Sequence, residues 1–248
     1  MTDSFTICIV TLNSSRTLQR TIDSLLEQTA PLVPIILQDG GSTDDTLNIA
    51  RRAISKGLPL EIFEAKDNGI SHGFNLALKQ VKSTYVTYLN SDDTFYPNYI
   101  HTILNILRAH THYDILIPSI VFQTESSRRL LNYRFSPDTF STPQINFPGM
   151  LIRTDLLRRI GGFDQKYARA MDVAMFYRLQ QFQPIVLHLD QPLVTQFDGG
   201  VSRASAARTL TEVAQIEIEN GRNTFSALAA LSYRLIKSKV ANLLRQTL

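Results

Sequence analysis

The sequence has a single cysteine, no long apolar run and, near its end, no acidic residue. Cys8 lies within the apolar run Phe5 to Val10, so no disulfide can form within the chain and we expect a reducing compartment. No uninterrupted apolar run approaches the ~18 residues of a membrane span. The segment Met1 to Ser4 lacks the basic region and longer apolar stretch of a secretion signal. These absences together predict a cytoplasmic protein.

Charge is sparse and unevenly placed. The net charge of +3 is too small to indicate nucleic acid as a partner, whereas residues 221–248 carry five basic side chains and no acidic one. Within this stretch, residues 225–245 place apolar side chains at helical spacing. Such a basic amphipathic helix can lie against the inner face of an anionic membrane, or it can pack on its own domain or on another copy of the chain. Both interpretations stay open.

The first hundred residues alternate short apolar runs with amphipathic segments. We expect strands at 5–12, 33–38, 60–64 and 84–89 and helices at 14–28, 43–55 and 70–81, with Ser14 and Thr43 as helix N-caps. This order predicts an α/β fold with a mainly parallel sheet flanked by helices. After about residue 113 the alternation weakens, and we expect a second half built onto the same sheet, followed by helices near 204–220 and 225–244.

Polar residues follow each of the four predicted strands. These segments are Thr11 to Ser14, Asp39 to Asp45, Lys66 to Gly69 and Asn90 to Asp93. Because parallel sheets bind ligands at the carboxyl ends of their strands, these segments are candidates for one site. The adjacent carboxylates Asp92 and Asp93 either face solvent in a turn or share a cation. Asp44 and Asp45 are expected in a first helical turn, where they favour the helix dipole.

Six segments, in order, resemble family 2 glycosyltransferases of GT-A fold. They are "IVTLNSSRTLQRTIDSLLEQT", "ILQDGGSTDDT", "AKDNGISHGFNLAL", "YVTYLNSDDTFYPN", "IRTDLLRRIGGFD" and "MDVAMFYRL". The resemblance implies a GT-A domain over residues 1–203, with a nucleotide-sugar-binding half at 1–110 and an acceptor-binding half at 111–203, and a helical extension at 204–248.

The resemblance implies a donor site in the first half. "NSDD" matches the metal-binding motif, with Asn90 in its first place and with Asp92 and Asp93 dividing ribose contact and coordination of Mg²⁺ or Mn²⁺. A cation between two phosphates stabilises the charge of the leaving group. Asp39 matches the aspartate that recognises the donor's base, and turn initiation before two glycines is its alternative. The remaining implied donor contacts are Thr11, Asn13, Asp67 and Asn75.

The resemblance also implies a general base in the second half. Asp172 matches the carboxylate that takes the proton of the acceptor hydroxyl, and its alternative is a helix N-cap. The sequence departs from the family's pattern at Met171, at Ala174, where a second aspartate is common, and at Asn146, near which histidine is frequent. The segment "FDGGVSR" at residues 197–203 matches a loop near the diphosphate or the acceptor, and a plain turn explains it equally well.

These features predict an inverting glycosyltransferase that moves a sugar from a nucleotide diphosphate, with a UDP-sugar as the first expectation, to a saccharide or lipid-linked acceptor. Cell-envelope polysaccharide or glycolipid synthesis is what the family implies, and a homo-oligomer stays open. A nucleotide-sugar-binding regulatory or scaffold protein without turnover is the alternative. A nucleotidyltransferase would need a glycine-rich basic loop after the first strand, and "TLNSSRTLQR" has no glycine.

Overall fold

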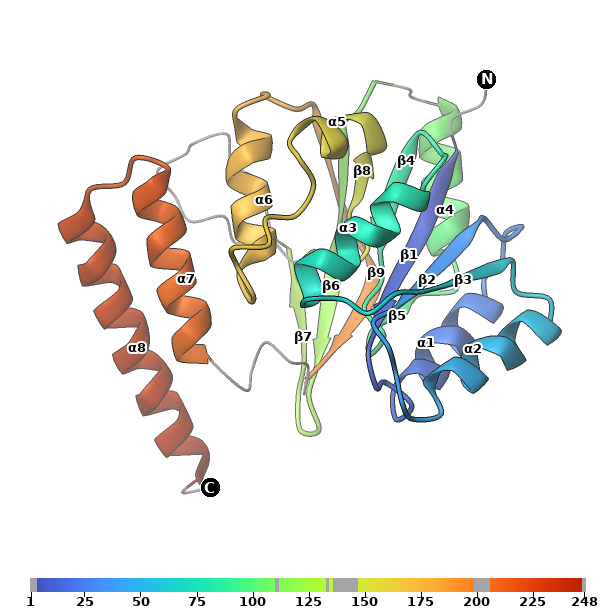
Figure 1. Ribbon diagram of the computed structural model, residues 1–248. Coiled ribbons are helices and arrows are strands. Elements are labelled where there is room, and N and C mark those ends of the chain that lie inside the picture. The colour runs from blue at the N-terminus through green and yellow to red at the C-terminus, as the bar shows by residue number, and fades with distance from the viewer. Residues whose placement is uncertain (1–3, 110–111, 133, 136–146, 199–205, 247–248) are drawn as a thin grey trace.

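A computed structural model describes residues 4–109, 112–132, 134–135, 147–198 and 206–246. Its first half alternates strands and helices, as the sequence predicts (Figure 1). The elements are β1 (Phe5–Thr11), α1 (Leu18–Leu26), β2 (Ile35–Asp39), α2 (Thr46–Ser55), β3 (Leu60–Glu64), α3 (Ile70–Gln80), β4 (Tyr85–Tyr88), β5 (Thr94–Phe95) and α4 (Tyr99–Ala109).

The second half completes the sheet and ends in a helical hairpin. Its elements are β6 (Ile115–Gln123), β7 (Arg128–Leu131), β8 (Leu151–Arg153), α5 (Thr154–Arg159), α6 (Met171–Gln180), β9 (Val186–Phe197), α7 (Ala206–Glu219) and α8 (Thr224–Gln246). The chain therefore forms an α/β sandwich with a C-terminal helical extension, and the predicted fold class is confirmed.

In the described part of the chain the strands form one sheet, ordered β3-β2-β1-β4-β8-β6-β9-β5, with β7 beside β6. The strands β3, β2, β1 and β4 pair in parallel. Strand β8 is antiparallel to both β4 and β6, and β9 is parallel to β6. It follows that β6 and β9 run in the same direction as β1, so the carboxyl ends of six strands meet at one edge of the sheet.

Helices cover both faces because β1 alternates its side chains between two apolar cores. Phe5, Ile7 and Ile9 face a core that contains apolar residues of α1, α2 and α4. Cys8 faces the other core, to which α3, α5 and α6 contribute. The thiol of Cys8 is fully buried, and this burial raises its pKa well above the ordinary range.

Several local predictions were wrong. Helix α1 begins at Leu18 with Thr17 at its N-cap, and α2 begins at Thr46 with Asp45 at its N-cap, so neither Ser14 nor Thr43 is a helix cap. Strand β9 is one strand of 12 residues, where the sequence predicts two extended segments, at 184–189 and 193–197, and its register with β6 shifts around Ser119. The short strands β5 and β8 were not predicted, because two or three residues carry too little periodicity.

The C-terminal hairpin of α7 and α8 packs beside α6 at the far end of the sheet (Figure 1). The carboxylate of Glu217 on α7 is fully buried and binds Arg222 at 2.6 Å and Arg234 on α8 at 3.1 Å. Because a buried carboxylate is costly without cationic partners, this pairing locks the two helices together. No helix among the described residues is long and apolar enough to cross a membrane.

Candidate active site

The loops that follow β1 and β2 are tied together at the carboxyl edge of the sheet. Asn13, in the left-handed region at φ 51°, accepts the Thr43 backbone N–H on Oδ1 at 2.9 Å. Its own N–H donates to Ser42 Oγ at 2.8 Å. Thr11 pairs with Asp39 in the β1–β2 register, and its buried hydroxyl oxygen finds no hydrogen-bond partner in the described structure. A buried hydroxyl without a partner is uncommon in folded proteins and requires an explanation.

Asp39 is fully buried and organises the loop that follows it. Its Oδ1 accepts the backbone N–H groups of Gly41 at 2.9 Å and Ser42 at 2.7 Å, and Oδ2 accepts the Ser42 hydroxyl at 2.5 Å. The turn-forming role considered from the sequence is therefore real. It is compatible with base recognition, because Oδ2 accepts one bond and a carboxylate oxygen can accept two.

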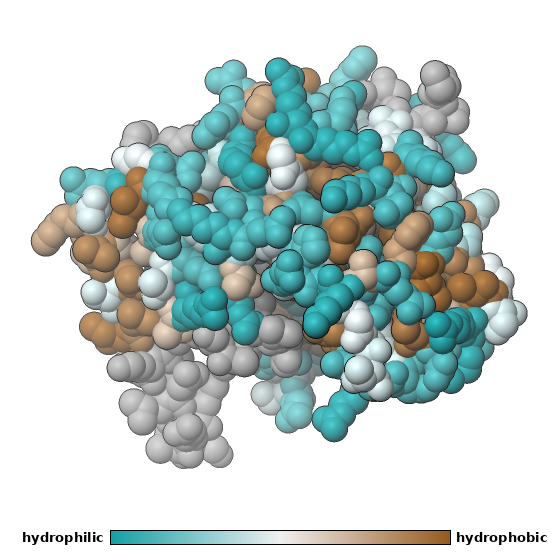
Figure 2. Space-filling view, in the orientation of Figure 1, coloured by the Kyte–Doolittle hydropathy of each residue, from teal (hydrophilic) through white to brown (hydrophobic). Residues whose placement is uncertain are grey.

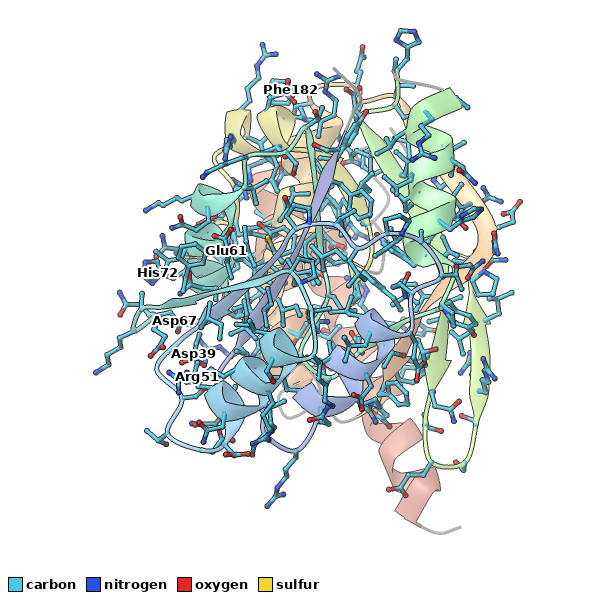
Figure 3. The ribbon with its side chains drawn as sticks, turned by 90° about the vertical axis from the view of Figure 1, so that its right-hand side faces the viewer. Asp39, Arg51, Glu61, Asp67, His72 and Phe182 are labelled. Atoms are coloured by element: carbon cyan, nitrogen blue, oxygen red, sulfur yellow. The ribbon has the colours of Figure 1, made fainter. Side chains whose placement is uncertain are left out.

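Asp67 lies against this loop. A Cβ added at Gly40 would overlap the Asp67 carboxylate, and one added at Gly73 would come within 3.0 Å of its Oδ2. Glycine at these two positions thus allows Asp67 to approach the Asp39 loop, and Figure 3 shows Asp39 and Asp67 as neighbours at this edge. His72, labelled beside them, accepts the Asn68 N–H on Nδ1 at 3.1 Å, which is a turn contact. The structure brings Asp39 and Asp67 together.

The adjacent carboxylates Asp92 and Asp93 have different environments. Asp93 is 1% exposed; its Oδ1 accepts the Phe197 N–H at the end of β9 at 3.0 Å, and its Oδ2 accepts Asn90 Nδ2 at 2.8 Å. Burial, and then the charge of Asp92, raise the pKa of Asp93 to about 7. Asp92 is half-buried, its pKa is raised by burial, and its carboxylate bonds no other described residue. Asp93 therefore joins two strand ends, whereas the Asp92 carboxylate makes no such bond within the described residues.

Helix α1 fixes the backbone of this pair. Arg20 donates from a guanidinium nitrogen to the Asp92 carbonyl at 2.7 Å, and the Thr21 hydroxyl donates to the Asp93 carbonyl at 2.8 Å. The Arg20 guanidinium also lies 3.5 Å from the centre of the Phe197 ring. These contacts have no signal in the sequence, because Arg20 and Thr21 look like ordinary positions of an amphipathic helix.

Asn75 and Asn90, which are predicted to contact the donor, use their side-chain amides in hydrogen bonds within the protein. Asn75 accepts the Phe163 N–H at 2.8 Å and donates to the Phe163 carbonyl at 2.7 Å, so it clamps α3 to the loop before α6. Asn90 directs its amide nitrogen to Asp93. The hydrogen bonds of the Asn75 amide therefore go to the Phe163 backbone. The donor contact of Asn75 stays a prediction with a competing structural role.

Asp172 lies in the first turn of α6 and is half-buried. Its N-cap alternative is wrong, since α6 begins at Met171 and its N-cap is Ala170. Asp172 Oδ1 accepts the neighbouring Val173 N–H at 2.8 Å, and burial raises the pKa of the carboxyl to about 6. A carboxyl with such a pKa is well placed to act as a general base near neutral pH. Its other oxygen is available for that task.

The segment before α6 reaches the amino end of α3. Ser71, in the first turn of α3, donates to the Tyr167 carbonyl at 2.9 Å and to Met171 Sδ at 3.3 Å. Helix α3 itself follows the Asp67 loop directly, so the segment that precedes Asp172 meets the carboxyl edge of the sheet. Asn146 and the loop residues 199–203 lie outside the described residues, so the roles predicted for them stay predictions.

Asp44 and Asp45 stay outside this group. Asp44 precedes α2, accepts the Ser15 N–H at 3.0 Å, and bonds Thr46 through both its N–H and its hydroxyl. These bonds hold the pKa of Asp44 well below its usual range.

A separate pocket of about 230 Å³ lies at the opposite edge of the sheet, lined by Asp114, Arg153, Asp155, Leu156 and Arg159. Its Arg153 pairs with the two aspartates, so this pocket is lined by an ion-pair network at the protein surface.

Comparison with known proteins identifies the family. The sequence model of glycosyl transferase family 2 matches residues 6–179, well over half of the chain. The chain belongs to glycosyl transferase family 2. The predicted family and the predicted class of enzyme, a glycosyltransferase, are thereby confirmed.

Relatives in the family are distant. An uncharacterized glycosyltransferase of Rickettsia prowazekii (strain Madrid E) is 26% identical over 233 residues, covering 89% of this chain and 70% of the relative. A PGL/p-HBAD biosynthesis glycosyltransferase of Mycobacterium bovis (strain BCG / Pasteur 1173P2) is 29% identical over 126 residues, covering 50% of this chain and 49% of the relative. Among the first curated relatives, the matched share of their length runs from 27% to 70%.

Solved structures share the fold. TarS of S. aureus (residues 1–349), in complex with UDP-GlcNAc, superposes with a TM-score of 0.70 at 20% identity, covering 90% of this chain and 69% of that one. The mannosyltransferase PcManGT of Pyrobaculum calidifontis, in complex with GDP-Man and Mn²⁺, gives 0.69 at 17% identity, covering 93% and 70%. The GT-A arrangement predicted for this family 2 chain is confirmed by these superpositions.

The residues of this chain fit a divalent cation only if the phosphates of a bound donor supply the remaining metal ligands. Within the residues described, no three aspartate, glutamate, histidine or cysteine side chains are grouped as a metal site. The half-buried carboxylate of Asp92, which bonds no other described residue, would be one oxygen ligand at the strand edge. Mg²⁺ commonly binds in this way, through one or two carboxylates together with substrate phosphates.

Proposed function

We propose that this chain is an inverting, metal-dependent glycosyltransferase that moves a sugar from a nucleotide diphosphate to a hydroxyl acceptor. The observation that carries the proposal is that the chain has carboxylates of two kinds, a group at the carboxyl edge of the sheet and a single carboxyl on α6. The buried Asp39 pairs with Thr11 in the β1–β2 register, and Asp67 lies against the loop that follows Asp39 at the same strand edge. The half-buried Asp172 has its pKa raised to about 6 by burial.

On the donor side, each residue has a role that its contacts support. Asp39 would accept the ring N–H of the base on Oδ2, with the backbone around Thr11 and Asn13 forming the walls of the base pocket. Asp67 would face the nucleoside or the diphosphate, and the side-chain oxygen Oδ1 of Asn90 would remain for the ribose. Asp92 would hold Mg²⁺ or Mn²⁺, which neutralises charge on the diphosphate as it leaves. A UDP-sugar is the first donor to test.

On the acceptor side, Asp172 would remove the proton from the attacking hydroxyl. A single base acting opposite the leaving diphosphate gives direct displacement and inverts the configuration of the transferred sugar. Because the carboxyl is half-buried, its charged form is disfavoured in the free enzyme and accepts a proton readily. Turnover would then fall as pH drops through the pKa of about 6.

Helix α8 supports a lipid-linked acceptor at a membrane surface. Phe225 is 83% exposed and Ile236 is 64% exposed, and with Leu228 and Tyr233 they form an apolar face directed away from α7. Figure 2 shows apolar side chains gathered along the edge where α8 lies. Of the five basic residues in 221–248, Arg222 and Arg234 are paired with the buried Glu217. The other three, in a stretch without acidic residues, would complement anionic lipid headgroups. We infer a cytoplasmic enzyme of cell-envelope glycan synthesis that touches the membrane through this face; pairing of two copies through it is the competing outcome.

A nucleotide-sugar-binding protein without turnover is the second candidate. Its support from the sequence is the two departures at Ala174, where an aspartate is common, and at Asn146, which lies outside the described residues. Ala174 is 5% exposed and packs with Val213 and Ile216 of α7, so an aspartate there would be buried in an apolar contact. The departure at Ala174 thus has a packing reason and does not require loss of activity.

A two-part experiment tests the proposal. Melting temperatures are measured with UDP, GDP and a panel of nucleotide sugars, each with and without Mn²⁺, and release of nucleoside diphosphate is then followed with the stabilising donor. We expect cation-dependent stabilisation by one nucleotide, lost in Asp92→Ala and kept in Glu61→Ala, which changes an exposed carboxylate on β3. Stabilisation without any turnover supports the second candidate, and no stabilisation by any nucleotide refutes both.

A further inference from the structure

The turn that leads into α6 is held by a residue of the C-terminal hairpin. The N-cap of α6 is Ala170, which has no side-chain hydrogen bond to offer. Glu212 on α7 accepts the backbone N–H of Arg169 at 2.8 Å and that of Ala170 at 3.0 Å, both on Oε2. Its Oε1 lies 3.4 Å from Arg208 Nε. One carboxylate, 42 residues further along the chain, therefore anchors the start of the helix that carries Asp172.

A second carboxylate of α7 holds the same segment closer to its beginning. Glu219, seven residues and two helical turns after Glu212, binds Lys166 Nζ at 2.5 Å and accepts the Tyr167 hydroxyl. Ser71 holds the Tyr167 carbonyl from the opposite side, on α3. The segment from 166 to 170 is thus gripped between the donor half of the sheet and the C-terminal hairpin.

Apolar packing makes this grip stiff. Ala170, Ala174 and Tyr177 form a buried cluster with Val213 and Ile216 of α7. The Glu212 side chain is 12% exposed, so its bonds are formed largely out of water, where hydrogen bonds to a charged acceptor are strong. Helix α7 is in turn fixed to α8 by the buried Glu217. The position of the first turn of α6 therefore depends on α7.

We propose that Glu212 is a positioning residue that holds the general base, so that the helical extension is part of the catalytic apparatus. The inference rests on the proposed role of Asp172 as the base. Ala170 is two residues before Asp172, and release of its N–H frees the turn that sets the direction of the carboxylate. A displacement of ~1 Å at a reacting group can cost up to about 10²-fold in rate.

The test compares Glu212→Ala, Glu212→Gln and the control Glu61→Ala, with Asp172→Asn in parallel. The donor identified by the melting screen is used, and kcat, the acceptor KM, the nucleotide Kd and the melting temperature are measured. In Glu212→Ala we expect kcat to fall about 10- to 100-fold, with nucleotide Kd changed by less than about twofold. Glutamine keeps an acceptor oxygen, so Glu212→Gln should return kcat to within about threefold of the parent.

The outcomes separate this inference from the proposed function. If Asp172→Asn keeps full turnover, the base assignment fails and the role of Glu212 falls with it. If Asp172→Asn is inactive while Glu212→Ala keeps its kcat, the base stands and the positioning role is refuted. The inference is also overturned if kcat and nucleotide Kd worsen together in step with the melting temperature, or if glutamine rescues nothing.

Discussion

Alanine substitutions at Asp92 and Asp93 should separate a metal ligand from a structural carboxylate, although the two residues are adjacent. Asp93→Ala removes the acceptor of two buried donors, the Phe197 N–H and the Asn90 amide. Each donor left without a partner costs about 1–2 kcal/mol, the lower part of the usual range, so we expect a loss of roughly 2–4 kcal/mol in the free energy of unfolding. For a chain of this size that corresponds to a fall in melting temperature of roughly 5–15 °C.

Asp92→Ala should behave in the opposite way. The half-buried carboxylate of Asp92 bonds no other described residue, so the free energy of unfolding should change by no more than about 0.5 kcal/mol. Cation binding contributes several kcal/mol to stabilising the charge of the leaving diphosphate. We therefore expect Asp92→Ala to lose ~4 kcal/mol of this stabilisation, which corresponds to a fall of about 10³-fold in kcat.

The assay is a melting curve in EDTA for both variants, followed by the increase in melting temperature with nucleoside diphosphate and Mn²⁺. Melting in EDTA isolates the protein's own bonds from cation binding. The reasoning is refuted if Asp93→Ala melts like the parent and loses its response to Mn²⁺, because Asp93 would then be the ligand. An equal destabilisation of both variants in EDTA would also contradict it.

The other predictions concern the base, the α3 clamp and the α8 face. Asp172→Asn should lower kcat by about 10²- to 10⁴-fold with unchanged nucleotide Kd, and the parent's kcat should rise with pH through about 6, as measured in a pH–rate profile. Asn75→Ala should lose about 2 kcal/mol of stability in denaturant titrations through its two Phe163 bonds, with little change in nucleotide Kd; a selective loss of nucleotide binding would favour the donor role. Phe225→Glu with Ile236→Glu should abolish co-sedimentation with vesicles containing phosphatidylglycerol, and unchanged co-sedimentation together with a shift from dimer to monomer would favour self-association.

The fold was predictable where the sequence signal is local. Each strand of the parallel half is a short apolar run followed by polar residues, and this pattern identified the edge at which Thr11, Asp39, Asp67 and Asp92 lie. The helix starts were placed too early because Ser14 and Thr43 look like caps, while the structure uses them in contacts between loops: Ser14 donates its N–H to Thr46 Oγ1, and Thr43 donates to Asn13.

The different roles of the site residues were not predictable, because distant partners determine them. The carboxylates of Asp92 and Asp93 look equivalent in "NSDD", and only the bond from Phe197, 104 residues away, distinguishes them. Asn75 pairs with Phe163 across 88 residues. Glu212 reads as one more charged position on an amphipathic helix. Sequence patterns identify which residues have the right chemistry, and tertiary contacts decide which of them are free to use it.

The burial of Cys8 has a practical use. Its thiol is fully covered by the sheet and its helices, and its raised pKa keeps it protonated at neutral pH, so alkylating probes should not reach it in the folded enzyme. A cysteine introduced at Phe225 would then take up a maleimide dye selectively without any change to the native thiol. A polarity-sensitive fluorophore at that position could report contact of α8 with lipid in real time.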